Sequence, residues 1–215
     1  MNSVLRRRDF NRLALSLFAL GLSPNVSGTS KPNTLLVVGD SLSAEYGIAR
    51  GTGWVALLDK QLAQEKQTWR VVNASVSGDT TAGGLSRLPR LLQQHQPKLV
   101  VIELGGNDAL RGFPLKTTES NLTQMAVACR KAEAEVLLIG MQVPPNYGQE
   151  YAQAFSRMFV RISQQQRTQL VPFMLKGVAD ANDPTALFQS DRIHPTAQAH
   201  PIILSNVWPV LKKML

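Results

Sequence analysis

Cysteine and histidine are scarce in this sequence of 215 residues, and both shortages limit what the protein can be. The single cysteine, Cys129, excludes an intramolecular disulfide and a zinc site built on cysteines. It lies among apolar residues at helical spacing, which is typical of a small buried side chain. The domain must therefore be stabilised by its hydrophobic core. The three histidines, His95, His194 and His200, leave few candidates for an acid–base catalyst.

Long apolar segments and clusters of basic residues are also missing outside the N-terminal region. The apolar stretch at residues 13–22 is too short to span a bilayer, which takes about 20 residues. The formal net charge is +8, and residues 1–28 contribute +3 of it. The other basic residues are scattered without interleaved aromatic residues, so we expect no nucleic-acid partner. We also expect no stable membrane insertion once the N-terminal segment is removed, and the oligomeric state stays open.

Residues 1–28 have the layout of a secretory signal peptide. Arg6, Arg7 and Arg8 precede the apolar stretch, and small or turn-forming residues follow at 23–28. The basic part is similar to a twin-arginine export signal, with Asn11 where a leucine is more usual. We expect residues 29–33 to form a linker, residues 34–215 to form one domain, and the mature protein to be periplasmic or secreted. The alternative is an amphipathic N-terminal helix that stays attached.

Short apolar runs alternate with amphipathic stretches along the rest of the chain. The runs are typical of strands, and the stretches repeat apolar residues at the spacing of a helix. Pro89 indicates a kink in one helix or the true start of that helix. Five strand–helix repeats predict one α/β domain, a parallel sheet with helices on both faces. The predicted strands are residues 34–38, 69–72, 98–104, 135–141 and 170–173, and the predicted helices are 54–65, 81–94, 120–132, 151–165 and 195–211.

Residues that could take part in catalysis follow three of the predicted strands. They are Ser41 in Gly39-Asp40-Ser41-Leu42-Ser43, Gly78, and Asn107 in Gly105-Gly106-Asn107-Asp108. In parallel sheets the reacting groups collect outside the carboxyl ends of the strands, so we expect these residues at one edge. Each segment alone is also typical of a simple turn, in which Ser41 or Asp40 caps a helix.

Near the C-terminus, Asp191 lies three residues before His194. A serine hydroxyl becomes a nucleophile when a base removes its proton, and the base is usually a histidine oriented by a carboxylate. In a turn, this spacing lets the carboxylate reach Nδ1 while Nε2 faces outward. His95 lies at a polar helix end and His200 at a predicted helix start, which favours His194 as the base. We predict that Ser41 is the nucleophile and that Asp191 orients His194.

Acyl transfer also creates an oxyanion, which needs hydrogen-bond donors aimed at it. Three candidates follow the predicted strands: the backbone N–H of Ser41, the backbone N–H of Gly78 and the side-chain amide of Asn107. The missing Cβ of Gly78 allows a close approach. The sequence therefore predicts a serine hydrolase with an oxyanion hole.

These residues stand in four blocks that resemble those of the SGNH (GDSL) hydrolase superfamily, named after its Ser, Gly, Asn and His. The resemblance covers about residues 34–212. It is stronger to one branch, the bacterial periplasmic enzymes called acyl-CoA thioesterase, lysophospholipase or arylesterase, through residues 72–75, 88–89, 103–108, 110–113 and 145–148. One departure is Arg192, where a glycine is common between the Asp and the His-Pro.

The resemblance implies a three-layer α/β/α fold of the flavodoxin type with a central five-stranded parallel sheet. It also implies hydrolysis of aryl esters, lysophospholipids and acyl thioesters through an acyl-serine intermediate, without a metal or a cofactor. The partner would then be a small-molecule or lipid acyl ester. The segment 110–115 would flank the acyl groove, and the candidate substrate-binding residues are Leu110, Phe113, Leu115 and Tyr147. The alternative for this segment is a surface loop with incidental apolar residues.

Two other functions are compatible with the fold that the sequence predicts. A carbohydrate acetylesterase uses the same four blocks, and would have a polar pocket and little activity on longer acyl chains. A catalytically silent lipid- or glycan-binding protein is disfavoured because every expected catalytic residue is present.

Overall fold

The computed structural model describes residues 32–183 and 185–215. The predicted signal peptide and residues 29–31 of the predicted linker lie outside these ranges, so both stay predictions, as does the periplasmic or secreted location. The first strand begins at Asn33, one residue before the predicted domain boundary. Within the described ranges, no helix has the length and apolar character needed to cross a membrane.

Five strands form one parallel sheet in the order β2-β1-β3-β4-β5. The central strands are buried because they have a strand on either side and helices on both faces. Their sequences are therefore nearly continuous runs of apolar residues. The edge strand β2 is only half-buried. The strands are β1 (Asn33–Gly39), β2 (Trp69–Asn73), β3 (Leu99–Glu103), β4 (Glu135–Ile139) and β5 (Gln169–Val171).

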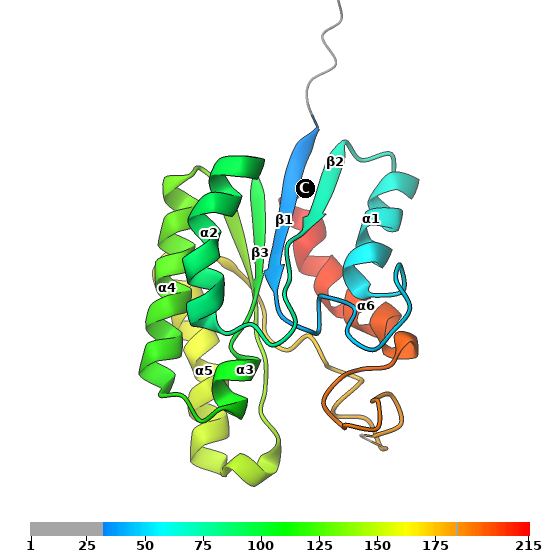
Figure 1. The fold of residues 1–215 in the computed structure, drawn as a ribbon, viewed down its shortest axis with the longest axis vertical. Helices are drawn as coiled ribbons and strands as arrows, with labels where there is room; N and C mark the ends of the chain where they lie inside the picture. Colours follow the sequence, from blue (N-terminus) through cyan, green and yellow to red (C-terminus); the bar gives the residue numbers. More distant parts are fainter. Residues whose placement is uncertain (1–31, 184) are drawn as a thin grey trace, which may run out of the picture. The chain divides into compact units, whose positions relative to one another are not determined.

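Helices cover the two faces of the sheet, as Figure 1 shows. On one face, α1 (Trp54–Gln64) packs against α6 (His200–Leu211). On the other face lie α2 (Thr81–His95), α4 (Leu115–Lys131) and α5 (Gln149–Gln166). This arrangement confirms the predicted α/β/α fold with a five-stranded parallel sheet. Cys129 of α4 is buried as predicted, and burial raises the pKa of its thiol to about 12.

One additional helix and two shifted helix starts are the main differences from the sequence prediction. A short helix, α3 (Gly106–Leu110), follows β3 where only a turn was expected, because five residues are too few to show a helical period. The next helix begins at Leu115 rather than 120, since its polar first turn is anchored by the buried Thr118. The last helix begins at His200 after a 3₁₀ turn at Ala197–Ala199. Pro89 is exposed inside α2 and does not mark its start.

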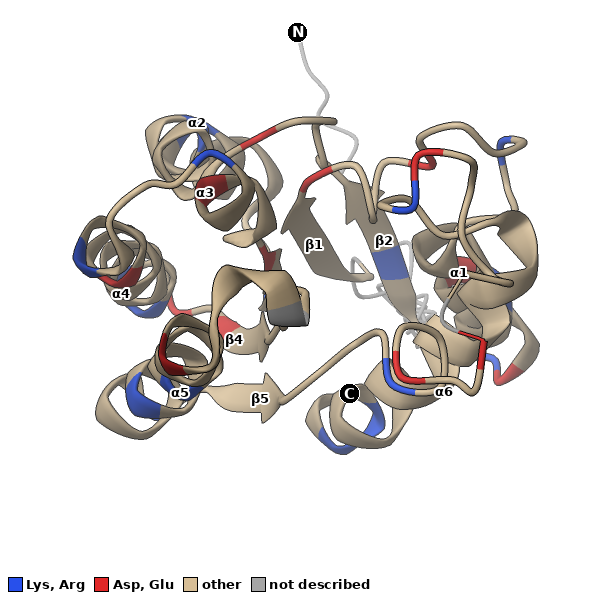
Figure 2. Ribbon diagram, turned by 90° about the horizontal axis from the view of Figure 1, so that it is seen from below, with Lys and Arg blue, Asp and Glu red and all other residues tan. Residues whose placement is uncertain are grey.

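The strand order creates a topological switch point between β1 and β3. After β1 the chain continues to β2 on one side, and then crosses to β3 on the other side of β1. Ligands of open parallel sheets bind outside the carboxyl ends of the strands at such points. Figure 2 views the domain from this end of the sheet. Ser41 follows β1 and Asn107 follows β3, so the fold brings both to the switch point.

Candidate active site

Ser41, His194 and Asp191 form one hydrogen-bonded chain. Ser41 lies in the turn directly after β1, and its Oγ is 2.8 Å from Nε2 of His194. The other ring nitrogen, Nδ1, is 2.6 Å from Oδ2 of Asp191. The loop after the last strand therefore carries a base to a hydroxyl 153 residues away in sequence. The geometry is the one that a nucleophile, its base and an orienting carboxylate require.

The Asp191 carboxylate is fixed by its own loop. Its Oδ1 accepts the backbone N–H of His194 at 3.0 Å and that of Ile193 at 2.9 Å. These bonds and the bond from the imidazole lower the pKa of Asp191 to about 2, with the backbone N–H of His194 as the largest cause. Asp191 is therefore ionised at neutral pH, although it is exposed. Arg192 has φ 58°, a left-handed conformation that glycine adopts without strain, which explains why glycine suits this position.

Two residues that sequence reasoning missed hold the nucleophile loop and the histidine loop together. The ring of Tyr46 lies 4.3 Å from the His194 imidazole, centroid to centroid. The side-chain amide of Gln189 donates to the carbonyl of Tyr46 at 2.9 Å and to that of Pro195 at 3.0 Å. The backbone N–H of Gln189 donates to the carbonyl of His194 at 2.8 Å. No short motif marks the contact between Tyr46 and Gln189, because the two residues are 143 positions apart in sequence.

The three predicted oxyanion donors lie in segments that adjoin one another. The Gly78 loop runs beside the end of β1, where the N–H of Val76 donates to the carbonyl of Gly39 at 3.0 Å. Gly78 has φ 78°, and its carbonyl accepts from the Arg111 guanidinium at 2.8 Å. In the described part of the chain, the backbone N–H groups of Ser41 and Gly78 donate to no protein acceptor. They are therefore free to bind a substrate oxygen.

The third donor, the Asn107 amide, stands in the first turn of α3. One of its N–H groups donates to Oδ2 of Asp40 at 3.0 Å, which leaves the second for a ligand. Asp40 also accepts the N–H of Leu42 at 3.0 Å. Burial raises the pKa of Asp40 to about 6, against the lowering effect of these hydrogen bonds. The residue before the predicted nucleophile thus orients one of the predicted donors.

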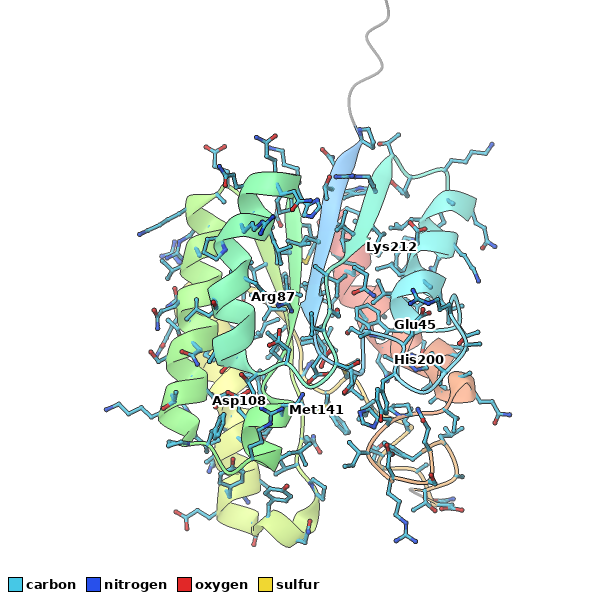
Figure 3. The ribbon with its side chains drawn as sticks, in the orientation of Figure 1. Glu45, Arg87, Asp108, Met141, His200 and Lys212 are labelled. Carbon is cyan, nitrogen blue, oxygen red and sulfur yellow. The ribbon has the colours of Figure 1, made fainter. Side chains whose placement is uncertain are left out.

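Polar contacts of Arg87 and Asp108, two residues that Figure 3 labels, brace the loops around Ser41. Arg87 of α2 pairs with Asp79 at 2.7 Å, and its guanidinium also donates to the carbonyls of Ala74 and Gly39. The Asp108 carboxylate accepts the N–H of Thr81 at 2.9 Å and also the hydroxyl of that residue. Together these contacts connect α2 to the loops after β1, β2 and β3.

The other two histidines have different surroundings. His200 is buried at the start of α6, and its Nδ1 accepts the N–H of Trp54 at 3.0 Å. Burial lowers the pKa of His200, so the imidazole stays neutral and caps the first turn of α1. His95 is the last residue of α2, a helix that runs antiparallel to the strands, so it lies at the opposite end of the sheet. Of the three, only His194 contacts Ser41.

Exposed apolar side chains stand on the segments that carry the site residues. Five of the six large apolar side chains that are exposed in the described chain lie on these segments, and we call them the apolar rim: Tyr46, Val76, Leu110, Phe113 and Ile193. Two of the predicted substrate-binding residues, Leu110 and Phe113, belong to this rim. Leu115 is half-buried against the core, and the ring of Tyr147 stacks on Tyr151 at 6.0 Å. The role of all four in substrate binding stays a prediction.

Metal ligands were not predicted from the sequence. In residues 32–183 and 185–215, no group of three or more His, Cys, Asp or Glu side chains is placed to hold a metal ion.

Comparison with known proteins connects this geometry to a family. The model of the GDSL-like lipase/acylhydrolase family matches residues 37–202. Esterase TesA of Pseudomonas aeruginosa is 54% identical over 182 residues, which cover 85% of this chain and 89% of that protein. A crystal structure of TesA has a TM-score of 0.82 and covers 85% of this chain and all of that chain, at 54% identity.

Two further relatives have lower identities. The arylesterase of Vibrio mimicus is 43% identical over 181 residues, 84% of this chain and 89% of that protein. The thioesterase 1/protease 1/lysophospholipase L1 of Escherichia coli is 44% identical over 171 residues, 80% of this chain and 79% of that protein. The chain therefore belongs to the GDSL-like lipase/acylhydrolase family, and it is an enzyme that hydrolyses esters.

Proposed function

We propose that this esterase acts through an acyl-serine intermediate at Ser41, on aryl esters, lysophospholipids and acyl thioesters. The observation that carries the proposal is the hydrogen-bonded chain from Asp191 through His194 to Ser41. The names of the relatives, an arylesterase and a thioesterase/lysophospholipase, support these substrate classes. The apolar rim supports an acyl chain as the part of the substrate that is recognised.

In the first half of the reaction, His194 Nε2 takes the hydroxyl proton while Ser41 Oγ attacks the carbonyl carbon. The carbonyl oxygen becomes an oxyanion, which the N–H groups of Ser41, Gly78 and Asn107 stabilise. Asp191 stabilises the imidazolium that forms. The tetrahedral intermediate then expels the alcohol or thiol, which takes its proton from His194. The acyl group stays on Ser41.

In the second half, a water molecule attacks the acyl-serine and gives its proton to His194. The same donors stabilise the second oxyanion. The intermediate collapses to the free carboxylic acid, and Ser41 recovers its proton. Every step needs only the side chains and backbone groups described above and one water molecule, so the reaction is balanced without a cofactor.

An acyl-length series tests the proposed substrate class. We expect kcat/KM to be higher for esters of longer acyl chains than for acetyl esters, because the rim offers apolar contact. Phe113→Ala should reduce this preference and leave acetyl-ester hydrolysis nearly unchanged. Val160→Ala is the matched control, since Val160 is as exposed as Phe113, at 40%, but lies on α5 outside the rim. Activity confined to acetylated sugars would replace the proposal with the carbohydrate acetylesterase.

The pH profile should rise from acid to neutral pH. Only a neutral imidazole can take the serine proton. Asp40, with its pKa near 6, becomes the carboxylate that accepts from Asn107 as the pH rises through that value. Asp191, with its pKa near 2, stays ionised throughout. We expect kcat/KM, measured from pH 4 to 9, to be low near pH 5 and level above about pH 8, whereas a maximum in acid would contradict this mechanism.

A further inference from the structure

Glu103, the last residue of β3, is a buried acid that the mechanism above does not use. Its side chain is only 2% exposed and lies beneath the turn that carries Ser41. Oε2 of Glu103 accepts the hydroxyl of Ser43 at 2.8 Å and the N–H of Asp40 at 3.2 Å. The Ser43 oxygen in turn accepts the indole N–H of Trp54 at 3.1 Å. One side chain therefore holds the residues on both sides of the predicted nucleophile.

A second buried acid, Asp40, is adjacent: its backbone N–H donates to Glu103, and each of the two carboxyl groups shifts the pKa of the other. Two adjacent carboxyl groups in a buried site do not both ionise, so the pair shares one proton at neutral pH. The N–H groups of Leu42 and Asn107 stabilise the charge on Asp40. In contrast, no Lys, Arg or His forms an ion pair with Glu103 within the described part of the chain. The proton therefore belongs on Glu103.

Both donors to Glu103 reach the same oxygen, Oε2, so Oε1 is the oxygen that can carry the proton. The directions of the pKa shifts agree with this assignment. Burial and the charge of Asp40 raise the pKa of Glu103 well above its ordinary range, whereas the pKa of Asp40 rises only to about 6.

We propose that Glu103 is a positioning residue, a neutral carboxylic acid that donates to Asp40 and so fixes the Asn107 amide for the oxyanion. The proposal rests on the proposed role of Asn107. In this arrangement the O–H of Glu103 donates to the Asp40 carboxylate, which also accepts one N–H of Asn107. With this N–H occupied, the amide cannot rotate freely, and its second N–H keeps one direction. Glu103 thereby couples the nucleophile turn after β1 to the helix after β3.

Other titratable or charged groups surround this pair. Arg87 donates to the Gly39 carbonyl at 3.3 Å, and His200 accepts from the Trp54 N–H. A positive charge on His194 lowers the pKa of Asp40.

The folded state keeps protons on Asp40 and Glu103 at pH values where the unfolded chain has lost them. Their contribution to stability therefore falls as pH rises above the ordinary range of these carboxyl groups.

Glu103→Gln and Glu103→Leu distinguish a neutral acid from a carboxylate. Glutamine can accept both hydrogen bonds on its oxygen and donate its amide to Asp40, so it copies the acid but not the carboxylate. We expect Glu103→Gln to keep kcat within about threefold, and Glu103→Leu to lower kcat about 10²-fold with a smaller change in KM. In an Asn107→Ala background, Glu103→Leu should cost little more, because the two act together. Equal damage from both Glu103 variants, or fully additive losses with Asn107→Ala, would overturn the proposal.

Two measurements keep the test valid even where Glu103→Leu fails to fold. The infrared spectrum of the wild type at neutral pH should contain a carboxylic-acid carbonyl band that Glu103→Gln removes. Asp108→Asn, which alters another buried acid, should retain this band. The melting temperature of Glu103→Gln should also fall less steeply than that of the wild type as pH rises. A spectrum unchanged by Glu103→Gln would show that Glu103 is ionised and would overturn the proposal.

The same experiments separate this inference from the proposed function. If Ser41 is not the nucleophile, Ser41→Ala keeps its activity while the infrared band still depends on Glu103. If instead Glu103 has only a structural role, Ser41→Ala is inactive, but the kcat loss of Glu103→Leu is additive with that of Asn107→Ala.

Discussion

Ser41→Ala and His194→Ala are each expected to lower kcat by about 10⁶-fold, and the double variant should lose little more. The reason is that Oγ and Nε2, 2.8 Å apart, act as one unit in proton transfer and attack. Removing either group leaves the other without a function. Asp191→Asn should be milder, at about 10⁴-fold, because an imidazole that is not oriented still accepts a proton. Steady-state kinetics on an aryl ester measures all four variants.

His95→Ala is the matched control for the histidine, since His95 lies at the far end of α2 and contacts neither Ser41 nor Asp191 in the described chain. It should keep nearly full activity. If His95→Ala were as harmful as His194→Ala, or if the losses from Ser41→Ala and His194→Ala simply multiplied, the assignment of the base would be wrong.

Asn107→Ala is expected to lower kcat by about 10²–10³-fold with a much smaller change in KM. The amide N–H that Asp40 does not occupy should bind the oxyanion more strongly than the ground-state carbonyl. Asn206→Ala is the control, because the Asn206 amide donates to carbonyls of Met174 and Lys176 beside α6 and not to the site. A kcat unchanged by Asn107→Ala would mean that Asn107 only shapes the start of α3.

Local patterns were sufficient to predict most of the fold. Each strand is built on a short apolar run, and the central strands are the most continuously apolar because helices cover both of their faces. The position of Ser41 and Asn107 at one edge followed from their place after parallel strands. The short helix α3 and the polar first turn of α4 were missed, since neither contains enough apolar residues to display a period.

The site was predictable only where its residues stand in short motifs. Asp191 and His194 are close in sequence, so their contact follows from spacing, and the block around Ser41 marks the residue that they meet. Tyr46 and Gln189 contact each other across 143 residues, and nothing local indicates this. Glu103 was visible in sequence only as the end of a strand. Its importance depends on Asp40, 63 residues away, which no periodicity reveals.

The most direct test of the central claim is covalent labelling with a fluorophosphonate probe, followed by mass spectrometry of the digested protein. The phosphonate phosphorus accepts the activated serine oxygen and loses fluoride, so only a serine with a working base reacts quickly. We predict one label, on the peptide that contains Ser41, and no label on Ser41→Ala or His194→Ala. A label on another serine, or an active enzyme that the probe leaves unmodified, would contradict the acyl-serine mechanism proposed for this site.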